Sequence, residues 1–261
     1  MQGKLMLTQV VKALLALAAT PALGASFADL TALSLAAPEV VRATVIKTVR
    51  LKPRDAPGIA AGMTRLLVTA ATTNAIAAPA SVAPKLSYLL DVSLDEHRKP
   101  PKIVGSDVLL FVRPGGAPDQ VALIAGRGTM PWSAAAEATV RTVLTAARRG
   151  DTPAITGVTS AFRVPGAVPG EAESQFFLST AAGKPVSLVV LTRPGETRRL
   201  TIATGDVIDD AAKPVELNTL LWYRLACGLP AKLPDGIEAG AEGADDWAFV
   251  LKSLGPCGRT L

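Results

Sequence analysis

Two kinds of hydrophobic pattern alternate along this chain of 261 residues, and together they predict a strand-rich α+β fold. Apolar and polar positions that alternate with period two are typical of strands that bury one face. This pattern recurs in the first half in five segments separated by turn-forming Pro and Gly: 40–51, 64–73, 85–92, 107–113 and 120–124. The sequence therefore predicts a small antiparallel β-barrel within residues 25–130, with an Ala-rich mobile loop at 70–84.

Two of these segments also carry a family resemblance. Residues 40–45 read VVRATV and residues 105–112 read GSDVLLFV. In these motifs the chain resembles the OB-like modules of exported proteins, in which a "VV.A.V" first strand and a "G..VLLFV" fourth strand recur. The whole chain resembles a group of uncharacterised exported bacterial proteins. The resemblance covers about residues 38–125 and implies an OB-like barrel, but it implies no activity.

The second half begins with a helical pattern and continues with strands. Ser133 is a plausible N-cap, apolar positions follow with helical spacing, and Gly150 marks the end, so 131–150 is predicted as a connecting helix. Residues 151–261 are predicted as a disulfide-pinned α+β domain. Its expected elements are strands at 154–164, 173–180, 186–192 and 197–204, of which the last three form a meander, and packed helices at about 218–227 and 245–254.

The first 24 residues have the pattern of a secretory signal peptide. Lys4 and Lys12 precede a short apolar run at 13–19, and the small residues Ala22 and Gly24 suit cleavage after Gly24. The run is too short to cross a hydrocarbon core of ~30 Å. We therefore expect a periplasmic or secreted protein with no stable membrane span after cleavage.

Cysteine and charge content refine this picture. The chain has two cysteines, Cys227 and Cys257, and an even number in an exported chain predicts one disulfide bond. A redox-active pair is the alternative, but it would favour a Cys-x-x-Cys spacing. Trp222 and Trp247 are expected to be core residues beside the disulfide. The formal net charge of only +5 does not favour a nucleic-acid partner.

A basic cluster is the first candidate binding site. It contains His97, Arg98, Lys99 and Lys102, and it could meet an anionic glycan, a lipid headgroup or an acidic protein. A solvated polar loop explains the same residues. His97 is the only histidine in the chain, and a metal site there would need ligands that converge with it. Asp91, Asp95 and Glu96 are near in sequence, but an exposed polar turn explains all of them.

Acidic residues form the second candidate. Glu171 and Glu173 could act as a carboxylate pair in glycoside hydrolysis if the fold brings another acid close. They are two residues apart at the start of a strand and point to the same side, so they could equally bind a cation or a sugar, or could simply be solvated. Asp206, Asp209 and Asp210 do not have the spacing of a calcium-binding loop. The chain lacks the Gly-x-Ser-x-Gly and Ser-x-x-Lys motifs of serine hydrolases, the phosphate-binding loop and the haem-attachment motif. No catalytic residue, metal or cofactor is therefore predicted.

These observations favour an exported, non-enzymatic binding or envelope-assembly protein. Its expected partner is an unidentified envelope protein or glycan. The alternative is an envelope hydrolase that acts on glycan or peptide through carboxylates such as Glu171 and Glu173.

Overall fold

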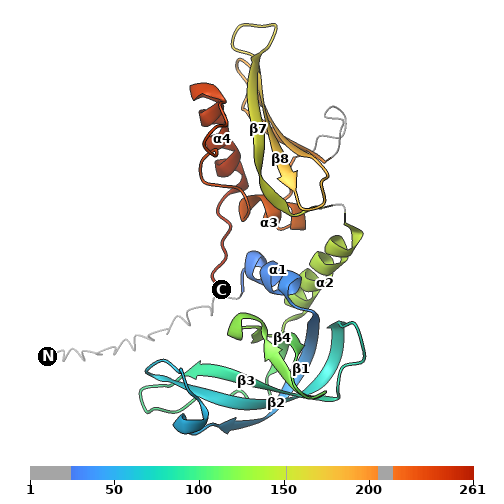
Figure 1. The fold of residues 1–261 in the computed structure, drawn as a ribbon, viewed down its shortest axis with the longest axis vertical. Coiled ribbons are helices and arrows are strands. Elements are labelled where there is room, and N and C mark those ends of the chain that lie inside the picture. Colours follow the sequence, from blue (N-terminus) through green and yellow to red (C-terminus); the bar gives the residue numbers. More distant parts are fainter. Residues whose placement is uncertain (1–24, 151, 205–213) are drawn as a thin grey trace, which may run out of the picture.

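The computed structural model describes residues 25–150, 152–204 and 214–261. Two antiparallel sheets lie at opposite ends of an elongated molecule, and a layer of helices joins them (Figure 1). The fold class is α+β and strand-rich, as predicted. The predicted signal peptide and Asp206, Asp209 and Asp210 lie outside the described residues.

The helices and strands follow one another in this order: α1 (Phe27–Ala36), β1 (Glu39–Arg50), η1 (Pro53–Asp55), β2 (Met63–Ala77), β3 (Lys85–Ser93), β4 (Asp107–Pro114), β5 (Val121–Leu123), η2 (Ile124–Gly126), β6 (Thr129–Pro131), α2 (Ala134–Arg149), β7 (Ile155–Pro165), β8 (Ala172–Thr180), β9 (Val186–Thr192), β10 (Arg199–Thr204), α3 (Leu220–Ala226) and α4 (Gly240–Leu254).

Sheet A, in the first half of the chain, has the strand order β3-β2-β1-β4-β5, and β6 pairs with β4. Strands β1, β2 and β3 are consecutive neighbours, and β4 returns to pair with the free edge of β1. This is the Greek-key arrangement. The two ends of the sheet approach each other where Ser87 of β3 forms a parallel bridge with Gln120. The sheet therefore curls into a half-barrel, in agreement with the predicted barrel-like architecture.

The inner face of sheet A forms the first core. Alternate residues of each strand point into it, as the period-two pattern predicts. Its buried members are Val41, Ala43, Val45, Leu66, Val68, Ala70, Leu86, Tyr88, Val108, Leu110, Val112, Val121 and Leu123. The mobile loop expected at 70–84 is wrong over 70–77, because β2 continues to Ala77 and pairs with β1 there.

The outer face of sheet A is covered at one end by α1 and α2. Val40, Leu109 and Phe111 point outward from the sheet and are buried against Leu30 and other helical residues. Helix α1 is not among the predicted elements, although its capping box can be recognised in the sequence. Ser26 Oγ accepts from the Asp29 backbone N–H, and the Asp29 carboxylate accepts from the Ser26 backbone N–H.

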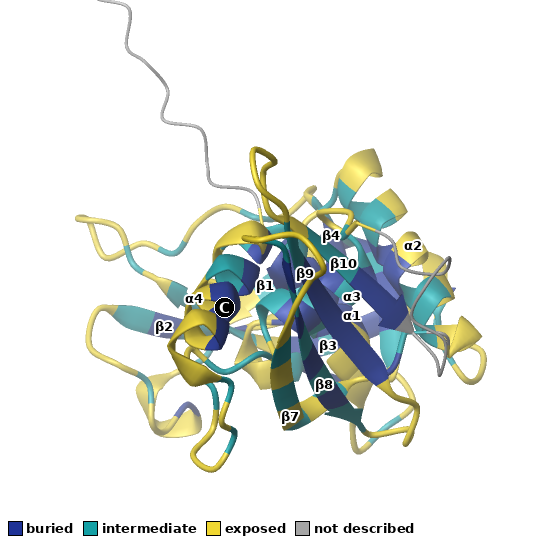
Figure 2. Cartoon of the chain, turned by 90° about the horizontal axis from the view of Figure 1, so that it is seen from above, coloured by how far each residue is buried: buried dark blue, intermediate teal, exposed yellow. Residues whose placement is uncertain are grey.

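Sheet B is a meander with the order β10-β9-β8-β7, and α3 and α4 pack on one of its faces. Buried positions are concentrated in β8 and β9 (Figure 2). Trp222 and Trp247 are both buried in this core, as predicted, and the Trp222 indole N–H donates to the Leu254 carbonyl at 2.7 Å. The predicted disulfide bond between Cys227 and Cys257 is present and joins the residues that follow α3 and α4.

The C-terminal tail, residues 255–261, leaves α4 and returns to α1. There the fully buried Asp29 carboxylate accepts hydrogen bonds from the Thr260 backbone N–H at 2.8 Å, the Thr260 hydroxyl at 2.8 Å and the Leu261 backbone N–H at 3.0 Å. Burial acts to raise the pKa of Asp29, but the hydrogen bonds from Thr260, Leu261 and Ser26 outweigh it and lower the pKa to about 2. The tail thus connects the layer around sheet B to the helix that covers sheet A.

Candidate binding surfaces

A groove runs along α4 in the half of the molecule that contains sheet B. Its volume is about 820 Å³, and we call it the α4 groove. One wall is a face of α4, and the other is the Pro-containing segment between α3 and α4. The lining residues are Ala231, Lys232, Leu233, Ile237, Glu238, Ala239, Gly240, Ala244, Trp247, Ala248 and Leu251.

The sequence of α4 explains why the groove is open. Residues 240, 244, 248 and 251 follow one another at intervals of three or four, and residue 247 lies three after 244 and four before 251, so all five share one side of the helix. Ala244 and Ala248 on this face have only a methyl group, which leaves space between the helix and the opposite segment. The same face presents Trp247 and Leu251, and the surface offered to a ligand is therefore mainly apolar.

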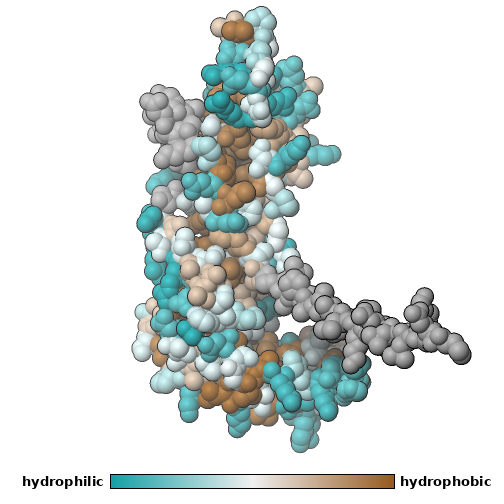
Figure 3. All heavy atoms as spheres, turned by 180° about the vertical axis from the view of Figure 1, so that it is seen from behind, coloured by the Kyte–Doolittle hydropathy of each residue, from teal (hydrophilic) through white to brown (hydrophobic). Residues whose placement is uncertain are grey.

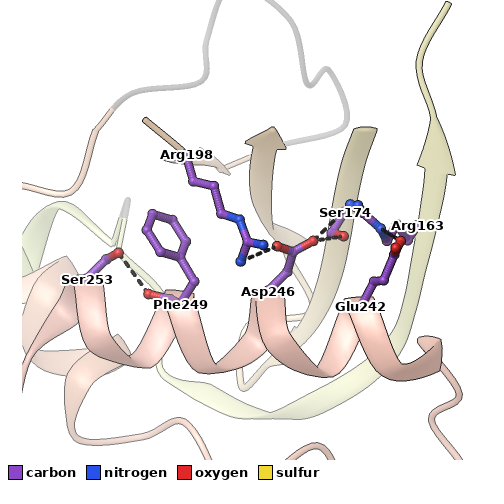
Figure 4. Close-up of polar contacts among 7 residues, drawn as sticks. All are labelled: Arg163, Ser174, Arg198, Glu242, Asp246, Phe249 and Ser253. Atoms are coloured by element: carbon purple, nitrogen blue, oxygen red, sulfur yellow. Dashed lines mark hydrogen bonds and ion pairs between the residues drawn. The ribbon is translucent and has the colours of Figure 1, made fainter. Parts of the chain in front are cut away.

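A buried polar cluster holds α4 against sheet B (Figure 4). Asp246 is only 1% exposed, and its Oδ2 accepts a hydrogen bond of 2.6 Å from the Ser174 hydroxyl and one of 3.1 Å from Arg163 Nη1. Arg198 Nη1 lies 3.2 Å from Asp246 Oδ1 and makes an ion pair. Arg163 also donates from Nε to Glu242 at 2.7 Å. The buried charge of Asp246 is therefore compensated from β7, β8 and the chain just before β10.

This cluster is a clamp rather than a nucleophilic site. A serine nucleophile needs a base such as histidine beside it, and Ser174 contacts a carboxylate that two arginines already neutralise. The only histidine, His97, belongs to the loop after β3 in the other sheet. Among the residues that the structure describes, no three His, Cys, Asp or Glu side chains gather as metal ligands would.

Glu171 and Glu173 have different partners in the structure. Glu171 lines a second cavity of about 560 Å³ together with Arg163 and Glu242, and it makes an ion pair of 3.3 Å with Arg193. Glu173 is not among the residues that line this cavity, and its carboxylate accepts a hydrogen bond from the Gln175 side chain. The acid that shares the cavity with Glu171 is thus Glu242, which is not among the residues predicted from the sequence. Glu242 lies four residues before Asp246, so the sequence already indicates that the two acids share one face of a helix.

The predicted basic cluster lies on an exposed loop at the free end of sheet A. His97, Arg98, Lys99 and Lys102 are all exposed, and the His97 imidazole lies 3.3 Å from the Glu96 carboxylate. The Arg98 carbonyl accepts a hydrogen bond of 3.3 Å from Arg50 Nη1, so the loop is attached to the end of β1. This hydrogen bond places Arg50 beside the cluster, and Lys52 and Arg54 follow Arg50 in the chain.

Comparison of the chain with models of known protein families gave no match, and no curated protein shows significant similarity to it. The resemblance to OB-like exported proteins consequently stays a prediction. The function has to be inferred from the surfaces described above.

Proposed function

We propose that this protein is an exported, non-enzymatic binding protein that takes a small apolar or amphiphilic molecule into the α4 groove. The observation that supports this proposal is the groove itself. Its volume of about 820 Å³ falls within the range of about 300–1,000 Å³ that is usual for small-molecule sites. Its lining is mainly aliphatic and aromatic with a few polar groups, which is also usual for such sites.

The few polar groups of the groove define the kind of molecule that fits. Trp247 contributes an apolar ring to the lining, whereas its indole N–H is buried and is not exposed to the groove. Lys232 and Glu238 also line the groove and offer charged contacts to a polar end of the ligand. A molecule with an apolar body and one polar end satisfies both features.

The surroundings of the groove favour a preformed site. The clamp at Asp246 fixes α4 against sheet B, and the disulfide bond between Cys227 and Cys257 ties the chain after α4 to the chain after α3. A rigid site loses less conformational entropy when a ligand binds, so more of the contact energy appears as affinity.

Export is the second part of the proposal. It rests on the predicted signal peptide and on the disulfide bond, which forms and persists mainly in oxidising compartments. Of the helices in the described parts of the chain, none has the length and apolar character needed to cross a bilayer.

The groove can be tested by filling it. Ala248→Trp places a large side chain between α4 and the opposite segment, whereas Ala138→Trp adds the same side chain to the exposed face of α2. With 1-anilinonaphthalene-8-sulfonate as a fluorescent probe, we expect the first substitution to weaken binding by roughly tenfold or more, about 1.4 kcal/mol, and the second to have no effect. Equal affinity of both variants, each with an unchanged melting temperature, would contradict the proposal.

A hydrolase is the second candidate, because Glu171 and Glu242 line one cavity. Its test is turnover of glycan and peptide substrates by the purified protein, with Glu171→Gln and Glu242→Gln as variants. Turnover that both substitutions abolish would support hydrolysis, whereas a folded protein that leaves every substrate intact would remove this candidate.

A further inference from the structure

The outer face of sheet A has two halves with different surroundings. The half next to α1 and α2 buries Val40, Leu109 and Phe111. A polar belt borders this half, where Arg42 Nη2 makes an ion pair of 2.9 Å with Asp107 and the Arg42 guanidinium stacks 3.6 Å above the Trp132 ring. Beyond this belt no helix covers the sheet in the described parts of the chain, and the second half is open (Figure 1).

Aliphatic side chains line the open half. Val49 of β1 pairs directly with Leu67 of β2, and Leu67 pairs directly with Leu89 of β3, so the three side chains stand in one row across the sheet. Their exposed fractions are 42%, 38% and 49%. We call this row the aliphatic ladder. Figure 3 shows apolar atoms on the surface of the end of the molecule that sheet A forms.

Two further exposed apolar side chains belong to β1 and to the segment beside it. Ile46 is 42% exposed and sits where the register of β1 shifts between Val45 and Lys47. Val104 is 58% exposed, and hydrogen bonds between Val45 and the neighbours of Val104, residues 105 and 106, hold it beside β1. A cluster of exposed apolar side chains of this kind usually marks an interaction surface.

Cations are concentrated at the end of sheet A next to the ladder. The end of β1, the loop that follows it and the loop after β3 carry seven Lys and Arg side chains but only three acidic ones, Asp55, Asp95 and Glu96. We call these cations the basic rim: Lys47, Arg50, Lys52, Arg54, Arg98, Lys99 and Lys102. The basic rim includes three of the four residues of the cluster that the sequence predicted. The hydrogen bond from Arg50 to the Arg98 carbonyl joins its two loops.

We propose that this end of the molecule docks on the surface of a membrane that contains anionic lipids. Cations at the rim attract anionic headgroups, and aliphatic side chains at the centre enter the boundary between headgroups and acyl chains. An anionic polysaccharide would pair with the basic rim but would leave the aliphatic ladder in water. A second copy of the chain would cover the ladder but would bring two basic rims together. The bilayer surface is the partner that satisfies both features, and this inference is independent of the α4 groove.

The experiment is co-sedimentation of the purified protein with vesicles of phosphatidylcholine alone and of phosphatidylcholine with phosphatidylglycerol. We expect binding to the anionic vesicles only, weakened by added salt. Lys52→Ala, Lys99→Ala and Lys102→Ala should each lower the affinity by roughly fivefold. Leu67→Ser together with Leu89→Ser should lower it by roughly tenfold or more, because both side chains leave water on binding.

Matched variants elsewhere on the surface complete the test. Arg127→Ala, Lys184→Ala and Arg148→Ala remove exposed cations outside the basic rim, and Val168→Ser with Leu217→Ser removes exposed apolar side chains outside the aliphatic ladder. Unchanged vesicle binding by these controls supports the proposal. Three results would overturn it: equal binding to neutral vesicles, binding to dextran sulfate without binding to vesicles, or a dimer in analytical ultracentrifugation that the ladder variants dissociate while no vesicles bind.

Discussion

Asp29 is fully buried between α1 and the C-terminal tail, and its replacement tests how strongly the tail is held. Its pKa of about 2 in the folded protein lies below the ordinary value of 3.8. A difference of this size corresponds to about 2 kcal/mol of stabilisation of the folded state when the carboxylate is charged. Asp29→Asn removes the charge and turns one hydrogen-bond acceptor into a donor that faces other donors. We therefore expect a loss of about 2 kcal/mol or more in the free energy of unfolding at pH 7.

The pH dependence of the free energy of unfolding tests this account more directly than the stability at pH 7 alone. Because the folded pKa is depressed, the stabilisation by Asp29 is fully present above the unfolded pKa of 3.8 and is lost as the pH falls toward about 2. Urea unfolding at several pH values between 7 and 2 should show that wild type and Asp29→Asn differ most at neutral pH and converge in acid. Asp91, Asp107 and Glu137 also have lowered pKa values, so the difference between the two proteins is the quantity to compare.

Two variants control this experiment. Deletion of Thr260 and Leu261 removes the donors of the tail but leaves the capping box with Ser26, so it should cause a smaller loss than Asp29→Ala, which removes both. Asp245→Asn alters an exposed carboxylate and should leave stability within about 0.5 kcal/mol of wild type. A stability gap between wild type and Asp29→Asn that stays constant from pH 7 to pH 2 would refute this account of the buried carboxylate.

Three other substitutions test the clamp at Asp246, the disulfide bond and the close packing at Gly128. Asp246→Ala leaves the guanidinium groups of Arg163 and Arg198 without their buried partner and should cost about 3–5 kcal/mol in urea unfolding; a cost no larger than that of Asp245→Ala would show that the clamp contributes little. Cys227→Ser removes a disulfide bond between residues 30 apart and should cost roughly 3–4 kcal/mol, and dithiothreitol should then have no further effect on the melting temperature. Gly128→Ala would place a methyl group against the Phe111 carbonyl and should lower the melting temperature far more than Ala138→Gly, a helix-surface change worth about 1 kcal/mol.

Most strands and the helix α2 could be predicted because their patterns are local. The strand at Val186–Thr192 has the predicted limits, and α2 begins after its predicted N-cap Ser133. The first helix was missed because an apolar run directly after a signal-like segment has no clear period of its own. The start of α4 was placed at Asp245 instead of Gly240 because Gly240 and Gly243 lower helix propensity. Contacts of Glu242 with Arg163 favour the helical first turn despite the glycines.

The candidate sites could be predicted from the sequence less well than the strands and helices. The cations of the basic rim could be recognised around Arg98, because they are close in sequence. The aliphatic ladder could not, since Val49, Leu67 and Leu89 come together only through strand register. Likewise, the Asp246 cluster joins β7, β8 and α4 over more than 70 residues of chain. A local pattern shows which side chains share a face, whereas the partner of that face depends on tertiary packing.

The route of the C-terminal tail couples the two halves of the molecule thermodynamically. Cys257 is held next to α3 by the disulfide bond, and Thr260, only three residues later, binds Asp29 of α1. The disulfide bond thereby keeps Thr260 at a high effective concentration near Asp29. Reduction of the bond would remove this advantage and weaken the contact at α1, although no cysteine lies there. Reduction of a disulfide bond beside sheet B would in this way alter the contacts of α1, the helix that covers sheet A.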